Sequence, residues 1–542
     1  MSVAYDQPSA GISRTAVRAL LWAGPIAVVA SVAAGLEWIR LGLRVPSLID
    51  DWFAIGYSRP ALHALVHGDY SSAHVDFAGR YRPAYTAIWS YAQWHLFGQP
   101  SVTTAAMWGL IRAASFLIAI WLLARFTAPR TMACNPILWL APVAVALTPG
   151  TAVDLVRHGS AEPIMLAGLV IGLTLVGVSV RSFLLNPETL RSTRAWTVMV
   201  SGYLLYLVGV YSKESSVCLL AFVPFIVMWL RPRWTKRLAE SRLRWRLLAP
   251  VVFLLVAPLV HVAIHLAVAK SAGSDPYAGV HFSLARKLVA TLVFPLIGAP
   301  GPLGTLLWLA VVPIAIAQAA SLVYRRHPDR WLVTGVLFTG FAMSAFSLAR
   351  GDIPSRYYIP WLVAVAAVAV RSLPPARPLL QLALATLVIG IILPATRGAV
   401  GRWAQLEQSG STAVEMATSV TSAGCPIYLA NFDPERRVAI PRLLGFGNSI
   451  VQVPSCGRNS ARAYVLSWLN APLPQAFAQH CGSGWQEVAV RDRVNLYTCR
   501  NLPAEALPDQ DAASGTFRVA VVRLHRPSGN PSPERLFQSP AD

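Results

Sequence analysis

Charged residues are scarce in this chain. Only 13% of its 542 residues are Asp, Glu, Lys or Arg, and only four are lysine. Soluble domains carry roughly 25% charged residues. Hydrophobic residues make up 55% of the chain, and the mean hydropathy is +0.50. This composition excludes a disordered chain and an ordinary soluble protein.

Several signatures of soluble enzymes are missing as well. The sequence has no glycine-rich dinucleotide fingerprint, no Walker phosphate loop, no Cys-x-x-Cys pair and no internal repeat. Its six cysteines are too few to define a disulfide scaffold.

Apolar runs of about 20 residues recur along the first 400 positions, and each could cross a hydrocarbon core of about 30 Å. The first run, 16–36, follows Arg14 and is interpreted as a signal-anchor helix, with cleavage near Ala34 as the alternative. The sequence predicts an all-α polytopic membrane protein of about eleven helices with a small C-terminal α/β exported domain. The ten further spans are expected at 101–124, 136–149, 161–180, 196–211, 215–230, 248–269, 303–323, 331–349, 357–370 and 378–395.

The charges are distributed unevenly between the two sides. Loops expected inside hold 19 basic and 4 acidic residues, whereas the outer loops hold 12 basic and 10 acidic residues. An excess of Lys and Arg marks cytoplasmic loops. We therefore expect a multi-pass plasma-membrane protein with a cytoplasmic N-terminus. The same asymmetry explains most of the net charge of +21 without a nucleic-acid partner, and the basic segment 231–246 is expected to lie against anionic headgroups.

The predicted organisation has three parts. Residues 1–396 form the transmembrane domain, with a long first outer loop at 37–100. Residues 397–502 form the extracytoplasmic α/β domain, and the Pro- and Ser-rich segment 503–542 is a flexible tail. Within the exported domain we expect a helix near 403–422 and a strand at 426–430.

Four of the six cysteines lie in the exported part, which indicates two disulfides. Proximity along the chain favours pairing Cys425 with Cys456 and Cys481 with Cys499. The other two cysteines lie in apolar spans and are interpreted as packing residues.

Ionisable residues gather in the loops expected at the outer surface, and in a membrane such groups usually mark function. The first outer loop contains Asp50-Asp51-Trp52 and the motif GRYRPAY, with Arg80 and Arg82. The later outer loops add Asp154, Arg157, His158, Glu162, Lys213, Glu214, Arg350, Arg356, Tyr357 and Tyr358.

This set of residue types suits sugar transfer from a phosphate-linked lipid. The adjacent carboxylates Asp50 and Asp51 could bind a divalent cation or act as a base that deprotonates an acceptor hydroxyl. Arginine forks grip phosphate oxygens and would stabilise a leaving phosphate.

Structural explanations remain open for these residues. Asp50-Asp51 could be a solvated turn, Lys213-Glu214 a local ion pair, and Arg356 with its two tyrosines an interfacial anchor. Asp154, Arg157 and His158 could pair with one another. His261 and His265 share a helix face at a metal-ligand spacing. Without a nearby third ligand on that span, they are interpreted as packing or pore-lining residues. Arg112 lies within a span and needs a partner that the sequence does not name.

Several short motifs resemble the GT-C superfamily of membrane glycosyltransferases, which includes protein O-mannosyltransferases and the aminoarabinose transferase of lipid A. Asp50-Asp51 matches that family's acidic pair just after the first span. GRYRP, the Ser212–Glu214 stretch SKE and the Ser355–Tyr358 stretch SRYY are similar to stretches in such proteins. The resemblance covers roughly residues 15–395. It implies inverting transfer from a polyprenyl-phosphate sugar to an exported glycan, lipid or protein at the outer leaflet.

Residues and resemblance together assign roles to the outer loops, with no covalent cofactor and with a divalent cation as an option at Asp50 and Asp51. The catalytic candidates are Asp50, Asp51, Asp154 and Glu162. Candidates for the donor phosphate are Arg80, Arg82, Arg157, His158, Lys213, Arg350 and Arg356. Candidates for the acceptor or sugar are Trp52, Glu214, Tyr357 and Tyr358.

Three other functions fit parts of the pattern. A transporter or flippase of lipid-linked sugars predicts ionisable groups deep in several spans and inverted repeats. A lipid-linked glycan polymerase or ligase would be rich in outer Arg and His without needing the acidic pair. A scaffold that has lost activity would tolerate loss of that pair.

Overall fold

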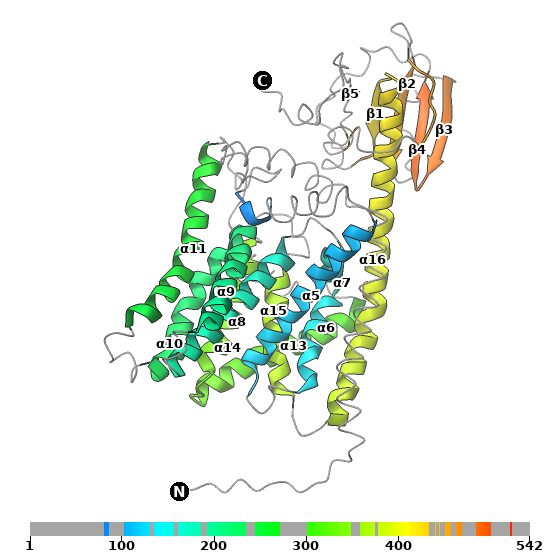
Figure 1. Ribbon diagram of the computed structural model, residues 1–542. Coiled ribbons are helices and arrows are strands. Elements are labelled where there is room, and N and C mark those ends of the chain that lie inside the picture. Colours follow the sequence, from blue (N-terminus) through cyan, green and yellow to red (C-terminus); the bar gives the residue numbers. More distant parts are fainter. Residues whose placement is uncertain are drawn as a thin grey trace, which may run out of the picture. The chain divides into compact units, whose positions relative to one another are not determined.

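The computed structural model of the chain forms two compact units, one made by the described residues up to Val400 and the other by those from Gly401 onward (Figure 1). The residues it describes are 81–85, 102–129, 135–156, 161–185, 192–234, 244–271, 301–347, 358–373, 378–432, 440, 444, 450–456, 462–468, 484–499 and 521–522.

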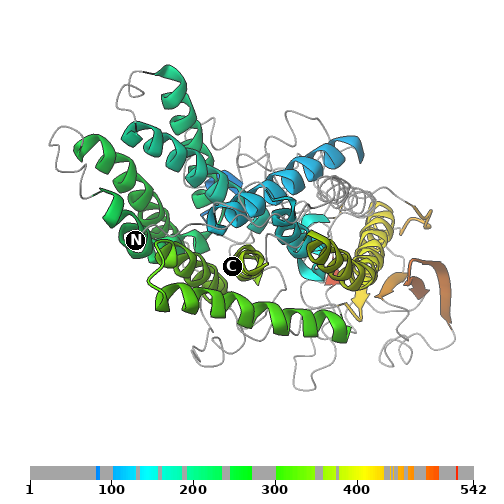
Figure 2. The same cartoon turned by 90° about the horizontal axis from the view of Figure 1, so that it is seen from below.

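The first unit is a bundle of helices, seen end-on in Figure 2. Ten predicted spans coincide with helical segments, while 16–36 lies outside the described residues. The segments are α5 (Val102–Thr127), η3 (Pro136–Trp139), α6 (Leu140–Ala146), α7 (Pro149–Val156), α8 (Glu162–Leu185), α9 (Thr193–Ser212), η5 (Glu214–Phe222), α10 (Val223–Trp234), α11 (Arg244–Ser271), α13 (Gly301–Tyr324), α14 (Arg330–Ser347), α15 (Ile359–Ala369), η7 (Val370–Ser372) and α16 (Pro378–Ser422).

Two of the described helices, α8 and α9, are long and apolar enough to cross a membrane by length and composition. Six further apolar helical segments are shorter, so the number of eleven spans remains a prediction. Large apolar side chains also lie on the outside of the bundle, among them Leu204 at 59% and Leu387 at 57% exposure.

Helix α15 lies at the centre of the bundle. Every residue from Ile359 to Val368 is buried, and the helix packs against α5, α6, α13 and α14. A helix that is apolar on all sides is expected at such a position.

Helices α8 and α9 touch backbone to backbone through glycines. A Cβ atom on Gly172 would lie 2.5 Å from the Tyr206 amide nitrogen and 2.7 Å from the Gly202 carbonyl oxygen. A Cβ atom on Gly168 would lie 2.6 Å from the Gly209 amide nitrogen. Small residues permit this close helix approach, which compensates for the weak hydrophobic drive between helices in lipid.

We expect Gly172→Ala to destabilise the bundle by about 1–3 kcal/mol, because the added methyl group overpacks a backbone contact. Gly177→Ala on the same helix is the matched control, since a Cβ there meets nothing within 4 Å. Thermal unfolding of the purified variants in detergent checks this. Equal melting temperatures for the two variants would contradict the close packing.

A tyrosine on α9 satisfies a carbonyl that a proline leaves open on α11. Pro258 has no N–H, so the carbonyl oxygen of Leu254, four residues earlier, lacks the backbone donor that a helix normally supplies. The Tyr206 hydroxyl donates to that oxygen at 2.6 Å. Pro258 and Tyr206 together therefore lead to one hydrogen bond that joins the two helices.

We expect Tyr206→Phe to cost about 1–3 kcal/mol, because a buried carbonyl loses its donor. The same substitution should cost much less in a Pro258→Leu background, where the residue 258 amide can take over. A double-mutant cycle on unfolding free energies measures the difference. If the two mutations are additive, the proline does not create the need for Tyr206.

The second unit contains the C-terminal part of α16 and a five-stranded sheet of order β3-β4-β2-β1-β5. The strands are β1 (Ile427–Ala430), β2 (Ala463–Trp468), β3 (Trp485–Arg491), β4 (Val494–Cys499) and β5 (Val521–Val522). Strands β1 and β2 are parallel, with Ile427 opposite Tyr464, and the other pairs are antiparallel.

Two expectations for this region have clear outcomes. The strand predicted at 426–430 is present as β1. The segments predicted at 378–395 and 403–422 are both helical, and they form one helix, α16, which runs unbroken from Pro378 to Ser422. The helix includes Pro394 and continues through Gly398 and Gly401.

The β3–β4 hairpin is tied to α16 through its turn. Asp492 and Arg493 have φ values of 50° and 65°, which is the conformation of a two-residue type I′ turn. The Asp492 carboxylate accepts hydrogen bonds from Gln408 at 2.9 Å and Thr412 at 2.7 Å. The Ser409 hydroxyl donates to the Asp492 carbonyl oxygen at 2.6 Å.

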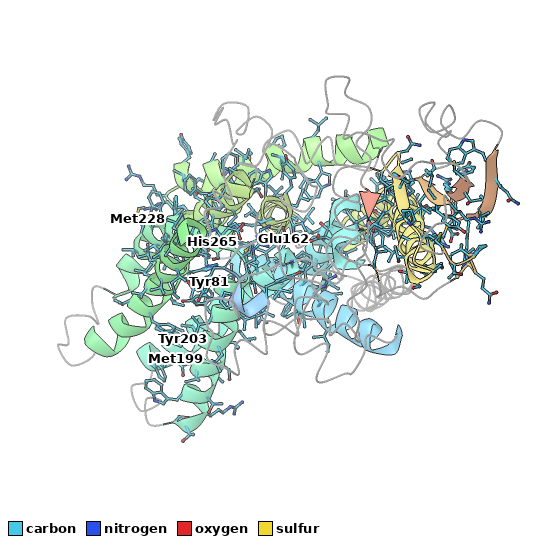
Figure 3. The ribbon with its side chains drawn as sticks, turned by 90° about the horizontal axis from the view of Figure 1, so that it is seen from above. Tyr81, Glu162, Met199, Tyr203, Met228 and His265 are labelled. Carbon is cyan, nitrogen blue, oxygen red and sulfur yellow. A yellow bond between two sulfur atoms is a disulfide. The ribbon has the colours of Figure 1, made fainter. Side chains whose placement is uncertain are left out.

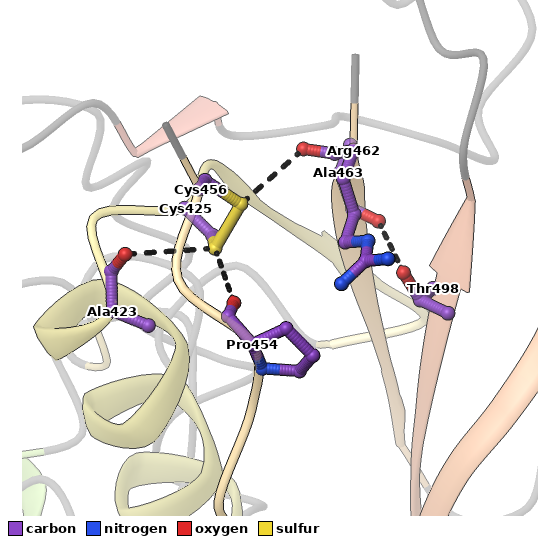
Figure 4. The surroundings of a disulfide bond; sticks show 7 residues. All are labelled: Ala423, Cys425, Pro454, Cys456, Arg462, Ala463 and Thr498. Carbon is purple, nitrogen blue, oxygen red and sulfur yellow. Dashed lines mark hydrogen bonds between the residues drawn. A yellow bond between two sulfur atoms is a disulfide. The ribbon is translucent and has the colours of Figure 1, made fainter. Parts of the chain in front are cut away.

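The predicted disulfide between Cys425 and Cys456 is confirmed (Figure 4). It joins Cys425, two residues before β1, to Cys456, which lies 31 positions later, and the Cys456 amide donates to the Ala423 carbonyl oxygen at 3.1 Å. Cys499 is also disulfide-bonded. Its predicted partner Cys481 lies outside the described residues, so that pairing remains a prediction.

Candidate functional site

The candidate site begins where the helical course of the chain breaks between α9 and η5. Lys213 is extended, with φ −159° and ψ 140°, between the last residue of α9 and Glu214. Serines on both sides take up carbonyl groups near the break. Ser212 donates to the Val208 oxygen at 2.5 Å, and Ser216 donates to the Val210 oxygen at 2.8 Å. Such local side-chain bonds compete with the helical pattern and support a break.

The break sends two successive charged side chains to different partners. Lys213 forms a buried ion pair with Glu162, the first residue of α8. Both side chains are about 5% exposed or less. A carboxylate at a helix N-terminus is further stabilised by the helix dipole.

Glu214 instead binds Arg82 from the short described segment 81–85. The Arg82 Nε and Nη2 atoms donate to the two carboxylate oxygens at 2.9 and 2.8 Å. Both side chains are 8% exposed. This two-bond geometry fixes the direction of the guanidinium as well as its position.

Tyr81, immediately before Arg82, is held by two helices. His261 on α11 lies with Nε2 3.0 Å from the Tyr81 carbonyl oxygen. The Tyr81 ring lies 5.8 Å from the His261 ring and 6.5 Å from the Tyr211 ring of α9. Burial, and next the neighbouring Tyr211, raise the pKa of Tyr81 above its usual value, so its hydroxyl stays protonated at neutral pH. Figure 3 looks down on this end of the bundle and labels Tyr81, Glu162 and His265 near its middle.

Arg112 of α5 binds the end of α7. Its Nη2 atom donates to the Asp154 carbonyl oxygen at 2.9 Å and to the Leu155 carbonyl oxygen. Asp154 itself is 2% exposed. A cation at a helix C-terminus satisfies carbonyls that have no partner within the helix.

The buried charges of the two ion pairs sum to zero. Removing a charge from water is expensive, and a buried ion survives only when a partner of opposite sign compensates it. Arg82 and Lys213 are therefore held in place by Glu214 and Glu162. Within the described part of the chain, no group of three or more His, Cys, Asp or Glu side chains could hold a metal ion.

Comparison with known proteins gives one structural likeness. The chain is similar to the crystal structure of ArnT from Cupriavidus metallidurans in the apo state. The TM-score is 0.48 at 16% sequence identity, and the match covers 87% of this chain and 97% of that one. No family model matches the sequence, and no curated protein matches it either. A TM-score below 0.5 does not establish a common fold, so the function proposed below follows from the residues of this chain.

The described structure brings together several residues that the sequence singled out. Arg82, Glu162, Lys213 and Glu214 form the two ion pairs, and Asp154 is buried at the end of α7. Tyr358 is 1% exposed and belongs to the apolar core at the start of α15. The other candidates lie outside the described residues: Asp50, Asp51, Trp52, Arg80, Arg157, His158, Arg350, Arg356 and Tyr357.

The alternative of a local Lys213–Glu214 pair is wrong, and the contacts of Arg112 and His261 were not predicted. Lys213 and Glu214 do not form a local pair with each other, since each has a partner far away in the sequence. No partner was predicted for Arg112, and His261 was interpreted as a packing or pore-lining residue. A lone arginine in an apolar span signals a need for hydrogen-bond acceptors, but its acceptors are backbone carbonyls, which no sequence pattern marks.

We expect Arg82→Met to destabilise the first unit by about 3–5 kcal/mol, because the buried Glu214 carboxylate would lose the guanidinium that binds both of its oxygens. The double variant Arg82→Met, Glu214→Met should recover most of that loss, since two apolar side chains replace the pair. Unfolding in detergent, followed by intrinsic fluorescence, compares the single and double variants. A double variant as unstable as the single one would show that the pair's charges are not mutually dependent.

Proposed function

We propose that the chain is a membrane glycosyltransferase with a GT-C-like fold that moves a sugar from a polyprenyl-phosphate donor to an exported acceptor, with inversion. The observation that carries the proposal is the pair of buried ion pairs at one end of the bundle. They bring a guanidinium from the first outer loop and a lysine from a helix break to the same group of helices.

Membrane insertion is supported by the surface of the first unit. Apolar side chains such as Leu204 and Leu266 are more than half exposed on helices whose sequences contain few charges. Exposed apolar area of this kind requires an apolar environment or a partner. A lipid-linked donor would approach the site from that environment.

The proposed chemistry assigns a phosphate role to the two cations. Arg82 provides a planar fork that matches phosphate oxygens, and Lys213 provides a second positive charge. Without donor, Glu214 and Glu162 compensate these charges, so the cations stay ordered in a site with little water. A bound phosphate would share or replace the carboxylates as their partner.

The reaction is a single displacement at the anomeric carbon. A carboxylate, Asp50 or Asp51 in this proposal, takes the proton from the acceptor hydroxyl as its oxygen attacks. The bond between the anomeric carbon and the phosphate oxygen breaks, and the electron pair leaves with the polyprenyl phosphate. The cations stabilise the charge that develops on that phosphate. A divalent cation held by Asp50 and Asp51 is the alternative role for the acidic pair.

We expect the purified wild-type protein to transfer or hydrolyse one member of a panel of radiolabelled polyprenyl-phosphate sugars. Asp50→Asn or Asp51→Asn should lower the rate by about 10²- to 10⁴-fold, which is the usual contribution of a general base. Asp69→Asn in the same outer loop is the control and should retain activity. Donor binding without turnover, unchanged in both variants, would favour a transporter or scaffold instead.

A further inference from the structure

We infer that His261 is a positioning residue, which orients Arg82 by holding the backbone of Tyr81. This inference rests on the proposed function for its consequence, because Arg82 is there assigned to the donor phosphate. The contacts that support it lie wholly within the helical unit and do not involve the donor.

The His261 ring forms a hydrogen bond with the backbone of Tyr81. His261 is fully buried on α11, and its Nε2 atom lies 3.0 Å from the Tyr81 carbonyl oxygen. A carbonyl oxygen has no hydrogen to donate, so the ring nitrogen is the donor. Nε2 therefore carries a hydrogen.

The other nitrogen of the His261 ring, Nδ1, determines the charge of the ring. Nδ1 is buried and has no hydrogen-bond partner among the residues that the structure describes. A second N–H at that position would be buried without an acceptor, which is costly. The ring is thus best described as neutral, with its single hydrogen directed at the Tyr81 carbonyl.

The hydrogen bond to Tyr81 lies immediately before Arg82 in the chain. The Tyr81 ring is flanked by His261 and Tyr211, whose own rings lie 5.1 Å apart. Main chain and side chain of Tyr81 are both held, so the following residue leaves this contact in a defined direction. Arg82 then meets both oxygens of Glu214.

The arrangement also gives the histidine pair of α11 a role other than metal binding. His265 lies one turn further along, with its ring 6.5 Å from that of His261. The two rings are not joined by a third metal-ligating side chain in the described part of the chain. His261 instead acts through the loop backbone, and any donor would be touched by Arg82 rather than by the histidine.

The test measures how accessible Arg82 is in the purified full-length protein. Phenylglyoxal modifies free guanidinium groups, and mass spectrometry of the digested protein gives the rate at each arginine. The variant His261→Gln retains an N–H near the position of Nε2, whereas His261→Leu removes the donor. His265→Leu is the matched control, because it replaces the same residue type at a comparably buried site one turn away.

We expect slow modification of Arg82 in the wild type, His261→Gln and His265→Leu, and modification about tenfold faster in His261→Leu, as expected for loss of one buried hydrogen bond. Arg112, which is bound to the end of α7, should react equally slowly in all four proteins. Unchanged Arg82 reactivity in His261→Leu would overturn the inference. Equal acceleration in His261→Gln or His265→Leu would also overturn it, since general loosening would then be the cause.

A second measurement separates this inference from the proposed function. Binding of polyprenyl phosphate to the same variants should weaken in His261→Leu and be restored in His261→Gln. If Arg82 becomes reactive as expected but no protein binds the lipid, then His261 positions Arg82 and the proposed function is wrong. If the lipid binds and Arg82 reactivity never changes, then His261 does not position Arg82, and the proposed function is retained.

Discussion

The need to compensate buried charge governs the arrangement of the helical unit. Two basic and two acidic side chains lie buried at one end of helices that contain few other charges. Each would be strongly destabilising alone, so each fixes the place of its partner. Through these pairs, the segment 81–85 is joined to η5, and the α9–η5 break is joined to the start of α8.

The break at Lys213 makes this pairing possible. One extended residue between two helical segments lets adjacent side chains reach partners 51 and 132 positions away in the sequence. The nearby glycine contacts between α8 and α9 hold those two helices at a distance at which Lys213 reaches Glu162. A phosphate that entered this site would meet cations already placed and largely shielded from water, which strengthens electrostatic interactions.

Sequence reasoning located the helices because their signal is local. Apolar runs and the charges between them marked most of the described helices of the first unit to within a few residues. Helix α7 was not predicted, because its residues had been assigned to an outer loop. The Cys425–Cys456 disulfide could also be predicted, because an even set of cysteines in one segment leaves few pairings. The continuity of α16 was missed, since a polar stretch between apolar and amphipathic helices resembles a boundary.

The site was predicted only in part, because its contacts are not local. Arg82, Glu162, Lys213 and Glu214 stood out by residue type and by their place at the ends of apolar runs. Their pairing could not be derived, since it depends on how residues 81–85 meet α9, η5 and α11 in space. The contacts of Arg112 and His261 are with backbone carbonyls, and a carbonyl leaves no mark in an amino-acid sequence.

The most direct test of the central claim is a structure of the protein in a lipid nanodisc with polyprenyl phosphate added. The account predicts phosphate density within hydrogen-bonding distance of the Arg82 guanidinium and the Lys213 ammonium group, with at least one carboxylate displaced from its cation. A phosphate bound elsewhere, with both ion pairs intact, would contradict it.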